Sequence, residues 1–280
     1  MTDRPDLAVL FLARGVDGGR AEAEAFFASY RAFPAGAPHE LIVLAKGWEN
    51  APGRDDLSDL TRAAGGTVID LPDDGFDFGA YFRAAAKLPH LYICLLNTHS
   101  RIRAEHWLGH LRRAIAQPGI GAAGATGNWE STFTEHLLAW RAGNWLYRLR
   151  HLQRLIISWW RFPRFPNPCL RSNALIVERA LFTSFGATRR IPASKREAGD
   201  LESGRRGFSA YLRARGLALC VVGADGRVYP PAQWRQSGTF RVPGQANLLV
   251  ADNRTRDYES AEPARQKLLS EMSWDRGPPP

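Results

Sequence analysis

The sequence predicts an α/β fold: one domain with a mostly parallel sheet flanked by helices and a basic helical insertion. Over the first 125 residues, short apolar runs alternate with segments of helical periodicity, which is the pattern of βαβ units. The 280 residues suffice for one large domain or two small ones. We expect one domain over 1–275, an insertion at 132–168, and a flexible tail at 276–280.

Five strands and four helices are expected in this first part. The strands are apolar runs of strand length, at residues 7–13, 39–46, 67–71, 91–97 and 120–125. The helices carry apolar residues at helical spacing and end at glycine or proline signals, at residues 20–33, 55–64, 78–88 and 104–117. Asp77 is expected to be the N-cap of the third helix.

The second half is less regular. One long helix is expected over 135–160, before three prolines in 162–168. A strand at 174–177, a helix at 203–215 ended by Gly216 and a last helix at 265–274 should follow. Strands at 217–222 and 227–229 flank Asp225-Gly226, which is a typical hairpin turn.

Composition indicates an ordinary globular protein, with 45% apolar and 23% charged residues. Three scattered cysteines (Cys94, Cys169 and Cys220) do not make a disulfide framework, so a reducing compartment is expected. The chain opens with charged residues rather than a signal peptide, and no apolar stretch is long enough to span a membrane. We therefore expect a cytoplasmic protein, at most peripheral to the inner membrane.

The net charge of +9 is concentrated in one segment, because residues 136–177 contain seven arginines and no Asp or Glu. Leucines, tryptophans and an isoleucine recur there at steps of three and four, on a face that the arginines mainly avoid. The residues 137–161 therefore form either an interfacial helix on an anionic membrane or an amphipathic helix packed on the domain. Nucleic acid is a weaker alternative, because no recognised binding motif accompanies the basic residues.

Ligands of parallel sheets bind beyond the carboxyl ends of the strands. That rule selects Arg14, Lys46, Asp70, and the strand end at Asn97-Thr98-His99. Asn97 and His99 are two residues apart and should point to the same side. Their amide and imidazole groups could ligate a divalent metal, or could simply cap the strand.

An acidic pair, Asp200 and Glu202, is expected at the start of a helix. Either it is stabilised there by the helix N-terminus, or Glu202 serves as a general base. No Walker loop, dinucleotide-binding fingerprint, metalloprotease spacing or nucleophile elbow is present.

Taken in order over roughly residues 7–230, these pieces resemble the GT-A glycosyltransferases of the family-2-like group, a Rossmann-like fold of the nucleotide-diphospho-sugar transferase superfamily. Residues 77–85 followed by 92–99 are similar to the helix and strand before the family's Asp-x-Asp metal motif. Residues 200–203, with Arg215-Gly216-Leu217 and a strand ending at Tyr229, are similar to its acidic catalytic motif. The Asp-x-Gly-Ala-Tyr stretch at 77–81 also resembles rhamnan-synthesis proteins.

The resemblance implies an enzyme that transfers a hexosyl or deoxyhexosyl group from a nucleoside-diphosphate sugar to a glycan or lipid-linked acceptor. Glu202, or else Asp200, takes the position of the catalytic base, and Asn97 and His99 take the metal motif. Because both metal-binding acids are replaced, Mn²⁺ or Mg²⁺ should bind weakly or not at all. Cationic side chains would then offset the diphosphate charge. The candidates for this role are Lys46, Arg101, Arg171 and Arg205.

The resemblance also divides the site into two sides. The implied donor side comprises Arg14, Lys46, Asp70, Asp77, Asn97, His99 and Arg101. The implied acceptor side comprises Trp129, Glu130, Arg171, Asn173, Trp234, Arg241 and Gln245, with the last three as a late lid. Two alternatives remain: an inactive module of this fold that binds nucleotide sugars or glycans, and a membrane-surface adaptor that uses 137–161.

Overall fold

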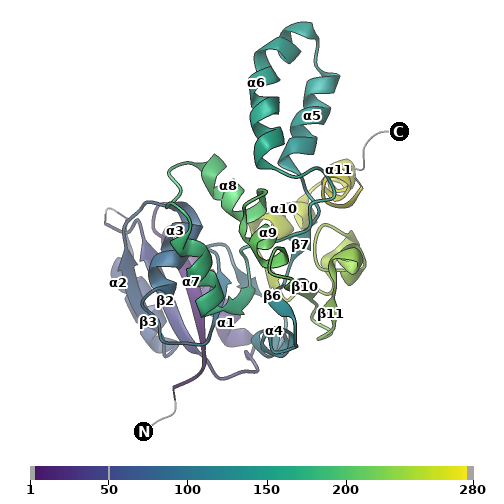
Figure 1. Cartoon of the computed structure of the whole chain (residues 1–280). Helices are drawn as coiled ribbons and strands as arrows, with labels where there is room; N and C mark the ends of the chain where they lie inside the picture. Colours follow the sequence, from purple (N-terminus) through teal and green to yellow (C-terminus); the bar gives the residue numbers. More distant parts are fainter. Residues whose placement is uncertain (1–3, 50, 276–280) are drawn as a thin grey trace.

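An eight-stranded mixed sheet forms the centre of the protein (Figure 1). The computed structural model describes residues 4–49 and 51–275. The strand order is β11 (Val228–Tyr229), β10 (Ala218–Val222), β6 (Ile120–Gly124), β9 (Leu175–Glu178), β4 (Tyr92–Leu96), β1 (Leu7–Arg14), β2 (Glu40–Lys46) and β3 (Thr67–Leu71). Only β9 and β11 pair antiparallel with their neighbours. The expectation of a mostly parallel sheet in an α/β fold is confirmed.

Helices cover both faces of this sheet. On one face lie α1 (Gly19–Ala32), α2 (Arg54–Ala63) and α4 (Trp107–Ile115), whose apolar side chains form one core cluster. On the other face lie α3 (Phe76–Ala85), α7 (Arg179–Ala187), α8 (Lys195–Ser203) and α9 (Phe208–Arg213), which belong to a second cluster. Alternate residues of β1 serve the two clusters, which explains why β1 is an uninterrupted apolar run. For example, Phe11 stacks on Phe26 of α1 with ring centroids 3.6 Å apart.

The basic segment folds as a helical hairpin that projects from the body of the protein (Figure 1). The single helix expected over 135–160 is wrong, because two helices are present, α5 (Thr132–Ala142) and α6 (Trp145–Arg161). Gly143 is extended and ends α5, and the Asn144 side chain caps α6 by accepting a bond from the N–H of Tyr147. Asparagine is a preferred N-cap residue, so these two positions favour a turn over a continuous helix.

Two short antiparallel strand pairs lie outside the eight-stranded sheet. The strand β12 (Val250–Ala251) pairs with β5 (Arg101–Ile102), and β7 (Gly127–Asn128) pairs with β8 (Cys169–Leu170). Three short 3₁₀ turns, η1 (Pro231–Gln233), η2 (Arg235–Ser237) and η3 (Pro243–Gln245), precede β12. Two helices follow it, α10 (Asn253–Ser260) and α11 (Pro263–Trp274). The sequence did not indicate α7 or α10.

Two further helix predictions are corrected. The third helix begins at Phe76 after Gly75, whose φ of 71° is left-handed, so Asp77 lies in the first turn and is not the N-cap. Asp200 and Glu202 lie in the last turns of α8, because the next helix, α9, begins only at Phe208. The positive end of a helix dipole therefore does not stabilise these two carboxylates.

The cysteines and the lengths of the helices can be compared with the expectations drawn from composition. The three cysteines are free thiols in the interior. Within residues 4–49 and 51–275, no helix is both long and apolar enough to cross a membrane. The tail expected at 276–280 lies outside the described residues.

Candidate functional site

Segments that are far apart in the sequence meet at the carboxyl edge of the parallel strands. The ends of β1 and β4 lie there beside the loop that enters β9, because β9 runs antiparallel to β4. The last turn of α8 and the first turn of α10 complete the wall of a cavity of about 230 Å³, here called the edge cavity. Its charged lining residues are Arg14, Asp17, Asp77, Arg171, Glu202 and Arg254.

Asn97 and His99 both line the edge cavity, as expected from the end of β4. The Asn97 side-chain oxygen accepts a bond from the N–H of His99 at 3.0 Å, so it also caps the turn. The His99 ring lies between two acids, with Nε2 3.5 Å from Asp17 and Nδ1 3.3 Å from Glu22. The two alternatives drawn from the sequence, a ligand-facing strand end and a capped turn, thus occur together.

The residues present do not fit a divalent-cation site. Mg²⁺ and Mn²⁺ prefer several oxygen ligands, chiefly carboxylates, whereas the strand end offers an amide already engaged in a turn and an imidazole. Across the described part of the chain, no group of three or more His, Cys, Asp or Glu side chains is arranged to hold a metal. The cations available in the edge cavity to offset the charge of an anionic ligand are its arginines, Arg14, Arg171 and Arg254.

Glu202 is separated from Asp200 by the turn of α8. Glu202 lines the edge cavity, and its Oε1 accepts a bond from the backbone N–H of Ser172 at 3.1 Å. Asp200 is instead paired with Arg161 at the end of α6 and lines a different hollow on the surface. Of the two acids proposed from sequence, only Glu202 faces the cavity that contains Asn97 and His99.

Asp77 is an acid of the edge cavity whose pKa is shifted. Burial raises the pKa of Asp77 above its usual value, and the neighbouring carboxylates of Glu202 and Asp17 act in the same direction. Arg14 and Lys46 oppose this rise without cancelling it. The pKa of Asp77 thus depends on burial and on the other charges of its cavity, which is a feature of functional sites as well as of structural networks.

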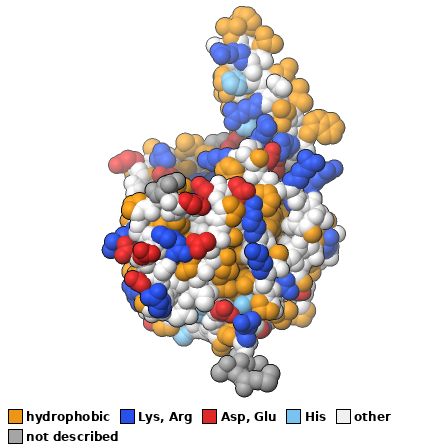
Figure 2. Space-filling view, turned by 90° about the vertical axis from the view of Figure 1, so that its left-hand side faces the viewer, with side chains coloured by type: hydrophobic (Ala, Val, Ile, Leu, Met, Phe, Trp, Pro, Cys, Tyr) orange, Lys and Arg blue, Asp and Glu red, His pale blue; other side chains and the backbone are white. Residues whose placement is uncertain are grey.

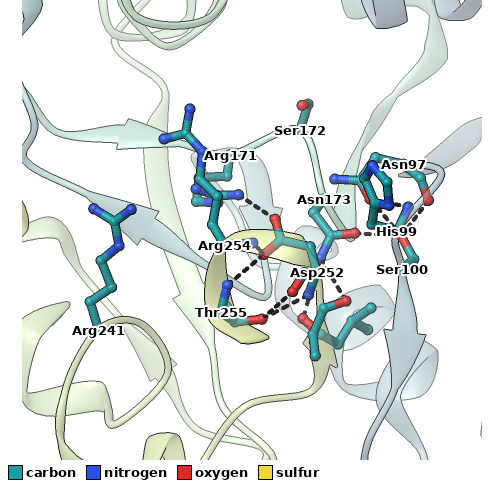
Figure 3. A network of polar contacts seen from close by, with 12 residues as sticks. Asn97, His99, Ser100, Arg171, Ser172, Asn173, Arg241, Asp252, Arg254 and Thr255 are labelled. Carbon is teal, nitrogen blue, oxygen red and sulfur yellow. Dashed lines mark hydrogen bonds and ion pairs between the residues drawn. The ribbon is translucent and has the colours of Figure 1, made fainter. Parts of the chain in front are cut away.

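Arg171 and Asp252 form a buried ion pair beside the cavity (Figure 3). Burial alone would raise the pKa of Asp252, but Arg171 and the backbone N–H of Thr255 hold that pKa below its usual value. Asp252 also caps α10, accepting bonds from the N–H groups of Arg254 and Thr255, both at 3.0 Å. This pair fixes both Arg171 and the start of α10, which carries Arg254.

Two arginines of the edge cavity retain unused donors. The Nε atoms of Arg14 and Arg171 are buried and have no hydrogen-bond partner. Buried polar groups are normally satisfied by protein, water or ligand. Both residues line the same small, strongly polar cavity, so an anionic ligand there could complete their bonding.

Two hollows adjoin the edge cavity through shared lining residues. One of about 570 Å³, the β2-side hollow, shares Arg14 and is also lined by Lys46 and Asp73. Lys46 is buried, and its Nζ donates to the carbonyl of Phe76 at 2.8 Å. The other, of about 350 Å³, is the α11-side hollow. It shares Arg171, Glu202 and Arg254 with the edge cavity, and Glu130 and Arg241 also line it, joined by an ion pair of 2.6 Å.

Two residues expected on the donor side lie outside the lining of these cavities. Asp70 is mostly exposed and forms an ion pair with Arg54 at 2.8 Å. Arg101 is paired with Glu22 at 2.6 Å and does not line the edge cavity. Each has a partner on the protein, so neither is brought to the site.

Several acceptor-side residues are interior. Trp234 is fully buried, and its Nε1 donates to the carbonyl of Tyr229 at 3.0 Å, so it is a core residue rather than part of a lid. Gln245 is also buried, and its amide donates to the carbonyl of Thr255 at 3.0 Å. Asn173 accepts a bond from Ser100 at 2.6 Å, and Trp129 packs edge-on against Trp274. Of that group, Arg171, Glu130 and Arg241 line a cavity.

Sequence reasoning missed Asp17, Asn253 and Arg254, which all line the edge cavity. Asp17 follows β1 by three residues, so the same strand-end rule could have found it. Asn253 and Arg254 required the pairing of β12 with β5, which no local signal announces.

Comparison with known proteins yields similarity of structure alone. No family model matches the chain, and no curated protein matches it. A mannosyltransferase from Pyrobaculum calidifontis, solved with GDP-Man and Mn²⁺, has a TM-score of 0.43 at 12% identity, covering 66% of this chain and 48% of that one. This chain therefore spans about half the length of that mannosyltransferase.

Two other solved structures are similar to a comparable degree. Glucosyl-3-phosphoglycerate synthase from Mycobacterium tuberculosis, with Mn²⁺, UDP and phosphoglyceric acid, has a TM-score of 0.45 at 17% identity, covering 78% of this chain and 68% of that one. A CMP:2-keto-3-deoxy-manno-octonic acid synthetase with CTP has a TM-score of 0.43 at 10% identity, covering 77% and 88%. Similarity at this level assigns neither a family nor an activity, and the function has to be argued from the site itself.

Proposed function

We propose that this protein transfers a sugar from a nucleoside-diphosphate sugar to a glycan or lipid-linked acceptor, with Glu202 as the general base. The observation that carries the proposal is the convergence of Arg14, Arg171, Arg254 and Glu202 on one polar cavity at the carboxyl edge of the sheet. Open α/β sheets bind their ligands at this edge. The three arginines suit an anionic leaving group, and the Glu202 carboxylate suits a hydroxyl nucleophile.

The donor diphosphate lies in the edge cavity in this proposal. Guanidinium groups match phosphate oxygens in charge and geometry, and Arg14 and Arg171 each have an unpartnered Nε–H there. The nucleoside extends into the β2-side hollow, which Arg14 also lines. The diphosphate charge is offset by side chains, in keeping with a strand end that does not fit a metal.

In the transfer step one bond forms and one bond breaks at the anomeric carbon of the donor sugar. The acceptor hydroxyl oxygen forms a new bond to the anomeric carbon, and the bond from that carbon to the diphosphate oxygen breaks. The hydroxyl proton passes to the Glu202 carboxylate, and the leaving diphosphate takes the bonding electrons beside the arginines. The acceptor approaches through the α11-side hollow, which shares Glu202 with the edge cavity.

Titration calorimetry with UDP-, GDP- and dTDP-sugars, with and without Mn²⁺, tests the donor site. We expect saturable binding of at least one donor, and roughly ten- to hundredfold weaker binding in Arg14→Gln, because a charge-assisted hydrogen bond contributes about 1.5–3 kcal/mol. Arg20→Gln is the matched control, since Arg20 is exposed and paired with Glu24 and Asp56. If no donor binds under either condition, the proposal is wrong.

A second candidate is a module that binds nucleotide sugars without turnover. The strand end at Asn97 and His99, which lacks carboxylates, favours it. The two candidates share the donor site and differ in chemistry alone. They are separated by the Glu202 variant considered in the Discussion.

We also propose that the α5–α6 hairpin docks on an anionic membrane. Large apolar side chains of α6 face solvent, including Trp145 at 71% exposure, Leu149 at 68% and Trp160 at 69%. Figure 2 shows apolar side chains along the projection, with Lys and Arg side chains among them and around its base. Residues 132–168 contain six arginines and one acid, Glu135. This combination suits the boundary between acidic headgroups and acyl chains.

Flotation with phosphatidylglycerol-containing liposomes tests the membrane proposal. We expect the protein to float with these vesicles, and Trp145→Ser with Leu149→Ser to reduce the floated fraction severalfold. Leu268→Ser is the control, because Leu268 is 49% exposed on α11 and is not part of the hairpin. Absence of flotation, or equal loss in the control, would argue against docking through the hairpin.

A further inference from the structure

The largest of the cavities described lies where the hairpin joins the body. It has a volume of about 740 Å³ and is here called the hairpin-base cavity. Its walls come from α5, from the second half of α6 and from the first half of α8. Nothing in the proposed transfer of a sugar uses this cavity, although it adjoins the site.

The hairpin-base cavity is strongly basic. Arg154, Arg161, Lys195 and Arg196 line it, and its lining, as far as the chain is described, contains no Asp or Glu. Arg161 is neutralised by its pair with Asp200. The other three cations form no ion pair with a described acid, so their charge is not offset within the cavity wall. Uncompensated cations around a hollow attract an anion.

His136 adds an unused donor to this wall. Its Nε2 accepts a bond from the Nε of Arg154 at 3.1 Å, so in this arrangement the proton of the neutral ring lies on Nδ1. The Nδ1 atom is buried and has no partner. Burial, and then Arg154, lower the pKa of His136, which is consistent with a neutral ring. A ligand oxygen would satisfy this donor.

The same cavity has an apolar side. Ile157 and Phe162 line it, and the exposed face of α6 continues from it through Ile156 and Trp160. A small inorganic anion would leave these apolar surfaces in contact with water. A phosphate attached to a hydrocarbon chain would match both parts, with its head among the cations and its chain along α6.

The hairpin-base cavity is connected to the proposed site by shared walls. Thr132 and Gly199 line both it and the α11-side hollow, and the α11-side hollow shares Glu202 with the edge cavity. A molecule with its phosphate at the hairpin base could therefore extend a hydroxyl toward Glu202.

We propose that the hairpin-base cavity binds the phosphate head of a lipid, and that this lipid phosphate belongs to the acceptor. The second part rests on the proposed function, whereas the first part does not. The site is defined by Arg154, Lys195, Arg196 and His136, with Ile157 and Phe162 contacting the first carbons of the chain.

Titration calorimetry with monomeric dihexanoyl phosphatidate, dihexanoyl phosphatidylcholine and inorganic phosphate tests the assignment. We expect phosphatidate to bind at least tenfold more tightly than either of the others. Arg154→Gln with Arg196→Gln should weaken phosphatidate binding at least tenfold. The control is Arg150→Gln with Arg190→Gln, which removes the same charge from exposed positions that do not line the cavity. This control should change the affinity for phosphatidate less than twofold.

Three results would overturn the assignment: equal loss in both double variants, phosphatidylcholine binding as tightly as phosphatidate, or inorganic phosphate doing so. The acceptor role is tested separately with a phosphate-bearing lipid acceptor. The cavity variant should raise its KM at least tenfold with kcat and donor binding nearly unchanged, and an unchanged KM would overturn the role. If phosphatidate binds as expected but no nucleotide sugar does, the proposed function fails and the lipid-phosphate site stands.

Discussion

The guanidinium of Arg171 is paired with the carboxylate of Asp252 in the interior, where the loop entering β9 meets the N-terminus of α10. Residues 81 positions apart are thereby joined at one wall of the edge cavity. The pair fixes Arg171, which lines the cavity, and it holds the cap of the helix that begins with Asn253 and Arg254. The architecture of the site thus depends on a contact that neither strand-end reasoning nor composition indicates.

Asp252→Asn should destabilise the protein by about 3–5 kcal/mol, because it leaves Arg171 charged and buried without its partner. The folded-state pKa of Asp252 is lowered, so its contribution is present above the unfolded pKa and is lost as pH falls through the folded pKa. Urea unfolding at pH 7 and at lower pH measures both effects. Asp257→Asn, at an exposed pair with Arg265, should change stability by less than about 0.5 kcal/mol. Equal costs for the two variants would contradict the role given to the buried pair.

Asp77→Asn should make the protein more stable at neutral pH. Because burial raises the pKa of Asp77, the folded state holds its proton more tightly than the unfolded state does. The resulting stability is present below the ordinary Asp pKa of about 3.9 and is lost as pH rises through the folded pKa. The variant lacks this loss, so its advantage in urea midpoint should grow from acid to neutral pH. An advantage that does not depend on pH would show that Asp77 is not the cause.

Glu202→Gln should reduce turnover by about 10²–10⁴-fold with little change in donor binding, because a positioned general base contributes about that much. Asp200→Asn is the matched variant, since Asp200 lies on the same helix but is paired with Arg161 outside the edge cavity. Initial rates and donor titrations on the same preparations make the comparison. A larger loss of turnover in Asp200→Asn would reverse the assignment of the base. Donor binding without any turnover in the unaltered protein would favour the binding module.

Trp234→Ala should destabilise the protein by about 3–5 kcal/mol, as expected when a large buried aromatic side chain is removed. The Trp234 ring packs so closely on the backbone that a Cβ on Gly127 would lie 2.7 Å from it. Gly127→Ala should therefore also be destabilising, by about 1–3 kcal/mol. Thermal and urea unfolding measure both. A lid residue would instead leave stability unchanged and raise the KM of the acceptor, and that result would restore the prediction made from sequence.

The strands were predictable because their signals are local. The run from Leu7 to Ala13 is apolar throughout, and burial on both faces of a parallel sheet requires that composition. The helix ends were less predictable, because caps depend on one or two residues. Gly143 and Asn144 separate α5 from α6. The bond that the Asn144 side chain accepts from the N–H of Tyr147 starts a new helix, so a hairpin replaces the continuous helix.

Part of the site followed from the same local logic. Arg14, Asn97 and His99 stand at strand ends, and the parallel arrangement brought their strand ends to one edge. Asp70 obeys the same rule but lies on the edge strand β3, where Arg54 holds it on the surface. A strand end is therefore a necessary feature of such a site residue and not a sufficient one.

By itself the sequence determined the α/β class, the parallel strands, the concentration of arginines in one segment and the strand-end residues Asn97 and His99. Each of these depends on neighbours within a few turns of the chain, which periodicity and composition record. Tertiary structure alone decided that Glu202 rather than Asp200 faces the cavity, that Arg254 joins it and that Trp234 is core. Those outcomes depend on the direction of β9, on the pairing of β12 with β5 and on the Arg171–Asp252 contact. Interactions across such separations are selected by the free energy of the whole fold, and local sequence carries little record of them.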